Sequence, residues 1–253
     1  MAKRRKRLFK KRFKKKLKMR VYTAFDRARR RRVIVKRNPK VREVRHEYRA
    51  LKANQKNPYV VRLIRCRVRR RFGRRVGYLI LERVRGRTIR QLLKRRPKAL
   101  AARAVPIALN LLKAVELLHR SGYVHGDLHA GNVLVTDLQS ARVKLIDFQH
   151  AVRVNARGRA RARRTLPKPP AHLAPETRRR TIDRRYDIYG VGFILGSMLL
   201  GREPARRRAL WRRREPRRLW AVVRAAIRKS PARRFRSAEE MRLALEAAAR
   251  GEP

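Results

Sequence analysis

A large excess of positive charge constrains this chain more than any other feature of its sequence. Its 253 residues include 76 Lys and Arg against 17 Asp and Glu, which leaves a formal net charge of +59. Charge of one sign opposes a compact state through self-repulsion, unless counter-ions or a polyanion screen it. Hydrophobic residues still make up 43% of the chain, enough to bury a core. We therefore expect a folded protein with a polyanionic partner.

The positive charge is densest at the N-terminus, where more than half of the positions up to Arg20 are Lys or Arg. Such a block is typical of an arm and not of a core element, and we assign residues 1–18 to it. Two functions fit the arm: salt-sensitive contact with nucleic-acid phosphates, or a nuclear address. Phe9, Phe13 and Leu17 recur four apart, which fits either a helix with one apolar stripe over residues 8–18 or a poor first strand.

The apolar pattern excludes the membrane-spanning and secreted classes. The longest apolar stretch, residues 189–201, is shorter than the about 20 residues that a spanning helix needs. The cationic N-terminus leads into no apolar signal core. We expect an intracellular protein without a signal peptide, associated with nucleic acid in a nucleus, a nucleoid or a virus particle.

Between the arm and residue 85, β-branched and aromatic residues cluster in short runs, as they do in strands. One amphipathic stretch, residues 41–53, has the apolar spacing of a helix instead. We therefore predict a small β-rich N-terminal lobe with one helix over residues 19–85. Its predicted strands are residues 20–25, 32–36, 60–68 and 76–84.

From residue 86 onward the pattern becomes mainly helical, which predicts a larger C-terminal lobe over residues 86–253 and an α+β, bilobal fold class. Residues 148–172 are rich in Arg and Pro and lack periodicity, which predicts a long loop of functional importance. Ser237 and Glu240 predict a capping box at the last helix. The predicted helices are residues 89–94, 100–120, 184–200, 216–228 and 237–249, and the predicted strands are residues 133–135 and 143–146.

Acidic residues are scarce, so their positions are informative. Asp127 lies in the turn-rich segment VHGDLHAGNVLV, and Asn132 follows five residues later. A carboxylate there can orient and deprotonate a hydroxyl, while a carboxamide can bind a metal. Asp147, in KLIDFQHA, ends a predicted strand and is a second candidate magnesium ligand. Upstream, the segment VIVK ends a strand at Lys36, whose ammonium group can reach phosphate oxygens.

These motifs, in this order, resemble those of the protein kinase family, and the match runs from about Val21 to Glu246. The family's APE motif is intact, and its glutamate, Glu176, would pair with Arg234 of the late PxxR motif. Asp187 would brace the catalytic loop. The family's HRDxxxxN, DFG, APE, DxWSxG and PxxR patterns correspond to residues 125–132, 147–149, 174–176, 187–192 and 231–234.

The resemblance implies ATP and Mg²⁺ as cofactors and a role for each candidate residue. Asp127 would be the catalytic base for the substrate hydroxyl, and Asn132 and Asp147 would hold Mg²⁺ on the phosphates. Lys36 would contact the α- and β-phosphates and be positioned by Glu47, which the spacing selects over the other candidate of the same helix, Glu43. Residues 79–84 resemble the family's hinge segment, which would bond adenine through the backbone of Glu82 and Val84. Leu81 would be the gatekeeper, and Leu134 would form the floor under the adenine base. The residues expected around ATP are Val21, Ile34, Lys36, Leu81, Glu82, Val84 and Leu134.

The sequence departs from the family pattern in ways that bear on activity. Lys14, Lys16 and Met19 stand where the glycines of the phosphate loop are expected, so backbone amides cannot approach phosphate as glycine allows. Ile34 replaces an alanine and would narrow the adenine pocket. Three further departures are Gly126 for the arginine of HRD, His129 for the lysine of Ser/Thr kinases, and Gln149 for the glycine of DFG. Pro169 stands five residues before APE, where Ser/Thr kinases usually have Thr, and in this it resembles the tyrosine kinase pattern.

Three functions remain open. We favour an ATP- and magnesium-dependent protein kinase for Ser and Thr, held near nucleic acid by non-specific phosphate contacts and preferring acidic substrate segments. The alternative is a pseudokinase with little or no phosphotransfer that binds or packages nucleic acid. A kinase for a small acidic or sugar substrate is a minor third possibility.

Overall fold

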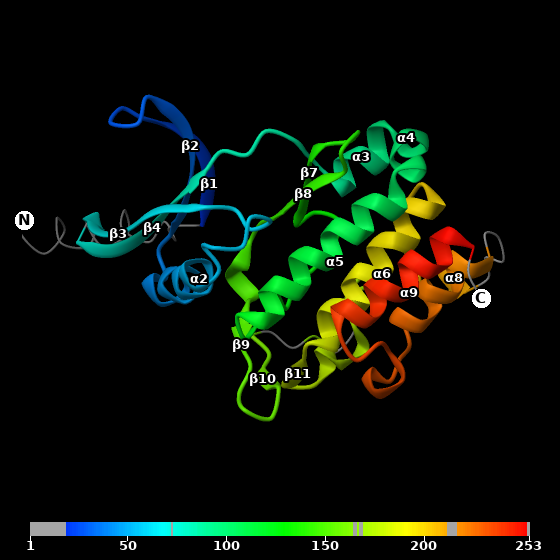
Figure 1. The fold of residues 1–253 in the computed structure, drawn as a ribbon. Helices are drawn as coiled ribbons and strands as arrows, with labels where there is room; N and C mark the ends of the chain where they lie inside the picture. The colour runs from blue at the N-terminus through cyan, green and yellow to red at the C-terminus, as the bar shows by residue number, and fades with distance from the viewer. Residues whose placement is uncertain (1–18, 72, 164–165, 167–168, 212–216, 252–253) are drawn as a thin grey trace, which may run out of the picture. The chain divides into compact units, whose positions relative to one another are not determined.

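The computed structural model describes residues 19–251, apart from residues 72, 164–165, 167–168 and 212–216. The predicted arm, with its alternatives of helix or strand, lies outside the described residues. The chain divides into two compact units, Met1–His46 with Leu63–Arg83 and Glu47–Arg62 with Val84–Pro253. A β-sheet characterises the first unit and helices the second, which confirms the predicted α+β, bilobal class (Figure 1).

The first unit contains a four-stranded antiparallel sheet of order β1-β2-β4-β3. Its third strand shows why this sequence forms a sheet: the arginines at positions 65, 67 and 69 are exposed, and the apolar residues between them are partly buried. This alternation places one residue type on each face of the strand. The strands are β1 (Arg20–Asp26), β2 (Arg31–Asn38), β3 (Leu63–Arg71) and β4 (Arg74–Glu82).

Helix α2 (Val41–Ala53) occupies the predicted residues, whereas β3 and β4 are displaced from their predicted bounds of 60–68 and 76–84. The displacement of β3 has a clear cause in the second unit. Val60 forms an isolated parallel bridge with Leu145, and the Val61 amide donates a hydrogen bond of 3.0 Å to the Leu145 carbonyl. Val60 and Val61 are therefore buried outside the sheet, and strand β3 begins only at Leu63.

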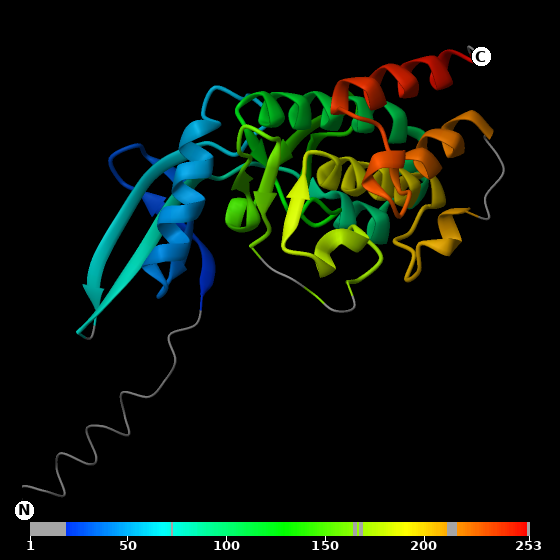
Figure 2. The same ribbon diagram turned by 90° about the horizontal axis from the view of Figure 1, so that it is seen from below.

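The second unit has its core around helix α6 (Arg185–Leu200), in which every residue from Tyr186 to Met198 is buried. Helix α5 (Ala104–Arg120) packs against α6 and α9 (Ala238–Arg250), and α8 (Arg217–Ala226) packs against α6 and α9. Figures 1 and 2 show these helices side by side. Among the described residues, no helix combines the length and the apolar character needed to cross a membrane.

Two predictions for this unit were wrong in detail. The predicted helix 100–120 is interrupted at Arg103, where α4 (Pro97–Ala102) ends before α5 begins. The predicted loop 148–172 contains two short strands, β9 (Val152–Arg153) and β10 (Arg159–Arg161), whose partners β6 (Tyr123–Val124) and β11 (Thr181–Asp183) lie outside the loop. Local periodicity does not reveal such pairing, because strands this short contain too few residues to show it.

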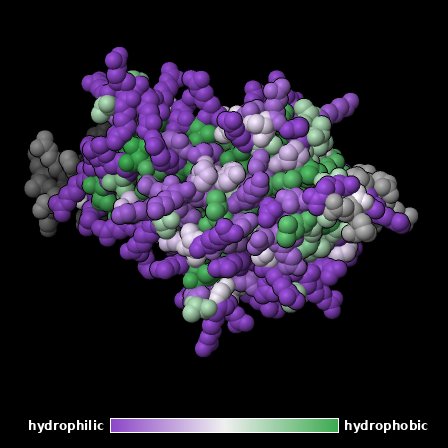
Figure 3. Space-filling model, viewed as in Figure 1, coloured by the Kyte–Doolittle hydropathy of each residue, from purple (hydrophilic) through white to green (hydrophobic). Residues whose placement is uncertain are grey.

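The remaining elements are short and connect this framework. Ser237 accepts a hydrogen bond from the Glu240 amide at the start of α9, which confirms the predicted cap. Figure 3 shows that hydrophilic side chains cover most of the face in view. The other elements are β5 (Arg87–Thr88), α3 (Ile89–Arg95), β7 (Val133–Asp137), β8 (Arg142–Leu145), η1 (Phe148–His150), η2 (Pro175–Arg178), α7 (Arg208–Trp211) and η3 (Pro231–Arg233).

Candidate active site

The hairpin of β7 and β8 brings Asn132 and Asp147 to the same end of two paired strands. Asn132 directly precedes β7, and Asp147 follows the end of β8 by two residues. Val133 pairs with Leu145, and the Ile146 amide donates to the Asn132 carbonyl at 3.0 Å, which extends the ladder one step beyond the strands. The backbones of Asn132 and Asp147 therefore lie at the same end of the hairpin, with Asp147 one residue beyond the partner of Asn132. Their side-chain oxygens are the kind of ligand that Mg²⁺ takes, so this pair fits the metal.

Asn132 is tied to the predicted base by its side chain. Its Nδ2 donates a hydrogen bond of 2.9 Å to the backbone carbonyl of Asp127. The bond closes the loop between the two residues and leaves the side-chain carbonyl oxygen of Asn132 as the end suited to a metal. Both residues are 7% exposed, so the loop presents them from a largely buried position.

Asp147 has an unusual backbone conformation. Its φ of 63° and ψ of 75° lie in the left-handed region, which non-glycine residues seldom adopt. The next residue, Phe148, is fully buried, and its ring lies 4.9 Å from the ring of His125. The Asp147 carboxylate also accepts a hydrogen bond of 3.4 Å from the Gln149 amide. Packing of Phe148 thus anchors the strained residue, a combination that is common at functional sites.

The carboxylate of Asp187, from the first turn of α6, braces the predicted catalytic loop from inside the core. It accepts hydrogen bonds from the backbone amides of His125 at 2.7 Å and Gly126 at 3.1 Å, and the Nε2 of His119 lies 3.0 Å away. This bracing was predicted from the sequence. Gly126 has a φ of +71°, and a Cβ there would lie 2.5 Å from the His150 carbonyl oxygen. The loop therefore requires glycine where the family pattern has arginine.

His129 lies beside the predicted base, at 3.9 Å from its Nε2 to the Oδ2 of Asp127. The Gly131 amide donates to the Nδ1 of His129 at 2.9 Å, and an Nη2 of Arg90 lies 3.4 Å from the same nitrogen. Because Nδ1 accepts these bonds, the proton of the neutral ring is on Nε2, the nitrogen nearer Asp127.

Arg90 is a residue of this site that the sequence analysis missed. Its backbone amide donates to the Ala130 carbonyl at 2.9 Å, and its Nε donates to Glu203 at 2.9 Å. Arg90 belongs to α3, which begins with a capping box of Thr88 and Gln91. That local signal predicts the start of a helix but not its contact with a loop that is distant in sequence.

In the first unit, the sheet register places four predicted ATP-binding residues on one face. Val21 is paired with Lys36, and Ile34 with Leu81. Directly paired residues share a face, as do residues two apart in one strand. Glu82, one position beyond Leu81, lies on the opposite face, which affects none of the backbone bonding predicted for it.

The other residues predicted to bind the nucleotide belong to different elements of the fold. Glu47 is in the middle of α2 and is buried, as is Lys36 in β2. Val84 follows β4, and Leu134 lies in β7, paired with Thr88 and Lys144.

A buried ion pair anchors Glu176, which lies in the segment after the predicted loop 148–172. Arg234 donates from Nη1 and Nη2 to the two carboxylate oxygens of Glu176, at 2.6 and 2.7 Å, which confirms the predicted pairing. The guanidinium also lies 5.0 Å from the centre of the Tyr189 ring, within range of a cation–π contact. Burial raises the pKa of Tyr189 to about 12, against the opposing charges of Arg207 and Arg234. Its hydroxyl donates to the Ala171 carbonyl at 2.8 Å.

Comparison with known proteins agrees with these motifs. Residues 19–241 match the family model described as "Protein kinase domain". A probable serine/threonine-protein kinase of Streptomyces coelicolor is 30% identical over 197 residues, which are 70% of this chain and 29% of that protein. Serine/threonine-protein kinase PknG of Mycolicibacterium smegmatis is 32% identical over 184 residues, 67% of this chain and 22% of that protein. The probable serine/threonine-protein kinase zyg-1 of Caenorhabditis elegans is 30% identical over 173 residues, 68% and 23% of the two chains. The chain thus spans less than a third of each of these relatives.

Proposed function

The chain belongs to the protein kinase family, and from this premise we propose that it transfers the γ-phosphate of ATP to protein hydroxyls, with Ser and Thr as the favoured acceptors. The observation that carries the proposal is the bonded arrangement of the catalytic loop. Asn132 donates to the Asp127 carbonyl, Ile146 donates to Asn132, and Asp187 holds the two amides before Asp127. A preorganised loop of this kind is what phosphoryl transfer requires, because catalysis consists mainly of positioning and electrostatics.

Each residue of the loop has a proposed role. Asp127 accepts the proton of the substrate hydroxyl and orients its oxygen towards the γ-phosphate. Asn132 and Asp147 hold Mg²⁺ through their side-chain oxygens. Mg²⁺, when bound, neutralises charge on the phosphate oxygens.

In this proposal the remaining predicted residues bind the nucleotide: Val21, Ile34, Lys36, Leu81 and Glu82 belong to the first unit, and Glu47, Val84 and Leu134 belong to the second. Lys36 contacts the α- and β-phosphates, and Glu47 positions it. The backbone groups of Glu82 and Val84 bond adenine, and the apolar residues that enclose it are Val21, Ile34, Leu81 and Leu134. The shared sheet face of Val21, Ile34, Lys36 and Leu81 supports this assignment.

We also propose that the positive charge holds the protein near nucleic acid. A net charge of +59 supports this, because phosphates neutralise the charges that repel one another in the protein, and the counter-ions released from the nucleic acid favour binding. The same charge favours acidic segments in protein substrates. The second candidate function, a pseudokinase that binds or packages nucleic acid, is supported by Met19 in place of a glycine and by Ile34 in β2.

A phosphotransfer assay with radiolabelled ATP and Mg²⁺ tests the proposal. Wild type is compared with Asp127→Asn and Lys36→Met, and with Glu239→Gln, an exposed carboxylate of α9, as the matched control. Each is measured with general acceptor proteins, with and without DNA, at two salt concentrations. We expect Asp127→Asn to lower incorporation by about 100-fold or more and Glu239→Gln to leave it unchanged.

Acid hydrolysis of the product then identifies Ser, Thr or Tyr as the acceptor. Absence of incorporation under every condition, with salt-sensitive DNA binding retained by all variants, would support the packaging function instead. Product formed on small alcohols but not on proteins would support a small-molecule kinase.

A further inference from the structure

A cationic pocket of about 560 Å³ lies in the second unit, among residues that the proposed kinase site does not use. It is formed by α7 and the residue before it, by the residues that follow α8, and by η3. Its volume is within the range typical of ligand sites. Its charged and aromatic lining consists of Arg207, Arg208, Trp211, Arg228, Lys229 and Arg233.

Within the described part of the chain, the five cations of this pocket have no counter-charge. The described residues that line the pocket include no carboxylate, and none of the five cations forms an ion pair with a described Asp or Glu. Two of the guanidinium groups donate to backbone carbonyls instead: Arg207 to Ile227 and Arg228 to Arg233, each at 3.4 Å. A carbonyl orients a guanidinium but does not neutralise it. The pocket therefore concentrates positive charge that an anionic ligand would relieve.

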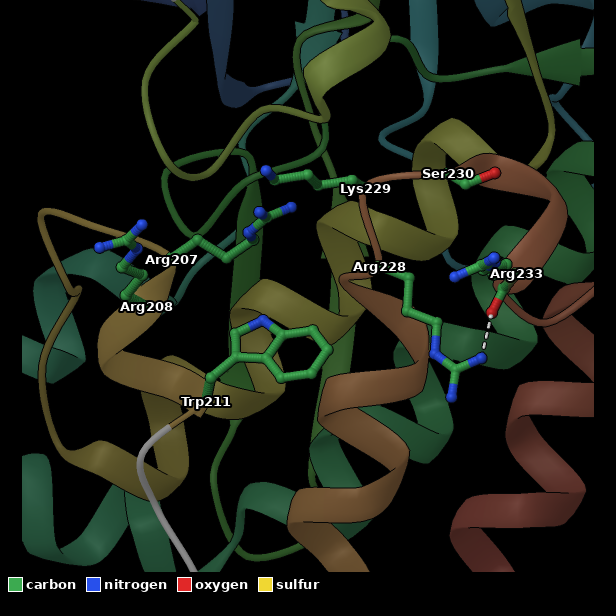
Figure 4. A pocket seen from close by; sticks show the side chains of 7 residues that line it. All are labelled: Arg207, Arg208, Trp211, Arg228, Lys229, Ser230 and Arg233. Atoms are coloured by element: carbon green, nitrogen blue, oxygen red, sulfur yellow. Dashed lines mark hydrogen bonds between the residues drawn. The ribbon is translucent and has the colours of Figure 1, made fainter.

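Trp211 gives the pocket an aromatic surface. It is 43% exposed, whereas the only other tryptophan, Trp220, is 2% exposed and belongs to the core. Figure 4 shows the Trp211 indole in the middle of the pocket, with Arg207 and Arg208 on one side and Arg228 and Arg233 on the other. An exposed indole between arginines can stack on a planar group while the guanidinium groups contact charges at its edges.

We propose that this pocket binds single-stranded nucleic acid, with one base stacked on Trp211 and the flanking phosphates held by the surrounding cations. A single strand supplies both a base with an open face and several phosphates, which matches the two parts of the lining. A duplex hides the faces of its bases, and a phosphopeptide needs no aromatic surface. The proposal rests on the nucleic-acid association proposed above and is independent of phosphotransfer.

Tryptophan fluorescence of the full chain tests the stacking contact. The probes are a thymidine oligomer of about 12 nucleotides and an abasic oligomer of equal length and charge. We expect the thymidine oligomer to quench Trp211 and the abasic oligomer not to do so. Trp211→Leu should abolish the quenching, weaken thymidine binding by about tenfold and leave abasic binding unchanged, whereas Trp211→Phe should retain most of the affinity. Trp220 remains in both variants and reports that the core is folded.

The salt dependence of binding tests the phosphate contacts. Arg208→Gln with Arg233→Gln removes two exposed cations of the pocket, which should flatten the slope of log K against log salt by about 1.4, at about 0.7 per contact. The matched control is Lys94→Gln with Arg95→Gln, two exposed cations at the end of α3. The control should leave the preference for thymidine over abasic oligomer as it is in wild type.

The outcomes separate this proposal from the more general one. Equal affinity for the two oligomers, with duplex binding retained and salt-sensitive, would overturn the pocket proposal and leave the nucleic-acid association standing. Quenching of Trp211 by a phosphoserine peptide but not by the thymidine oligomer would assign the pocket to a protein ligand instead. If the wild-type protein bound neither the oligomers nor the duplex in a salt-sensitive manner, both proposals would be overturned.

Discussion

Substitution of Arg234 should strongly destabilise the second unit. The Arg234 side chain is fully buried and donates to Glu176 and to three backbone carbonyls, those of Arg228 at 2.8 Å, Arg185 at 3.0 Å and Lys229 at 3.2 Å. Arg234→Met has a similar volume but no donor. It would leave a 9% exposed carboxylate without its cation and three carbonyls without this partner.

The expected magnitude follows from that geometry. Removal of one partner of a buried ion pair costs about 3–5 kcal/mol of unfolding free energy. Arg234→Met belongs at the upper end, near about 5 kcal/mol, because it also removes three bonds to carbonyls. Glu176→Gln belongs near about 3 kcal/mol, because glutamine retains an acceptor for one Nη group. The double variant should cost less than the sum, by on the order of 2 kcal/mol, because the unpaired charge is absent.

Urea denaturation followed by tryptophan fluorescence measures these changes, since both tryptophans belong to the second unit. In thermal unfolding, the loss for Arg234→Met corresponds to a fall in Tm of about 10–20 °C. Arg242→Met is the matched control: Arg242 pairs with Glu246 at 3.0 Å and Glu116 at 3.6 Å, but it is 19% exposed. The control should cost about 0–1 kcal/mol.

A loss below about 1 kcal/mol for Arg234→Met, equal to that of the control, would refute this reasoning. It would mean that solvent reaches the pair and that the buried geometry contributes nothing particular to stability. An additive double-mutant cycle would lead to the same conclusion for the contact between Arg234 and Glu176.

Three further predictions concern the proposed catalytic loop and helix α6. Gly126→Ala should lower the unfolding free energy in urea by about 2–4 kcal/mol, since it adds a clash to backbone strain, whereas Gly158→Ala, with a similar φ of +68° and open space, should cost only about 1 kcal/mol. Asp187→Asn should lower kcat by about 100-fold with little change in KM for ATP, because one amide then faces an NH₂ group; an unchanged kcat would contradict the bracing role. The raised pKa of Tyr189 means that the folded state binds the phenol proton more tightly than the unfolded state does. The contribution of this proton to the free energy of unfolding is therefore complete below about pH 10 and is lost as the pH rises to about 12. Between these values the urea stability of wild type should fall by about 1.4 kcal/mol per pH unit more than that of Tyr189→Phe, and parallel curves would exclude the shift.

Local pattern predicted the elements whose periodicity extends over many residues. Helix α2 occupies residues 41–53 as expected, and α6, α8 and α9 begin within a residue or two of their predicted starts. Prediction failed where an element depends on a distant partner. The short strands β9 and β10 each pair with a strand from another segment of the chain. The boundary of β3 shifted because Val60 and Val61 contact Leu145 in the second unit.

The sequence by itself determined which residues form the proposed catalytic loop, because one hydrogen bond joins Asn132 to Asp127 five residues earlier and Asp147 follows on the next hairpin. Only the tertiary structure decided which residues surround that loop, since Arg90 reaches it from the separate helix α3. The pocket around Trp211 is the clearest such case. Its cations are indistinguishable in sequence from the other Lys and Arg among 76, and only the packing of α7 against the chain after α8 places them around one exposed indole.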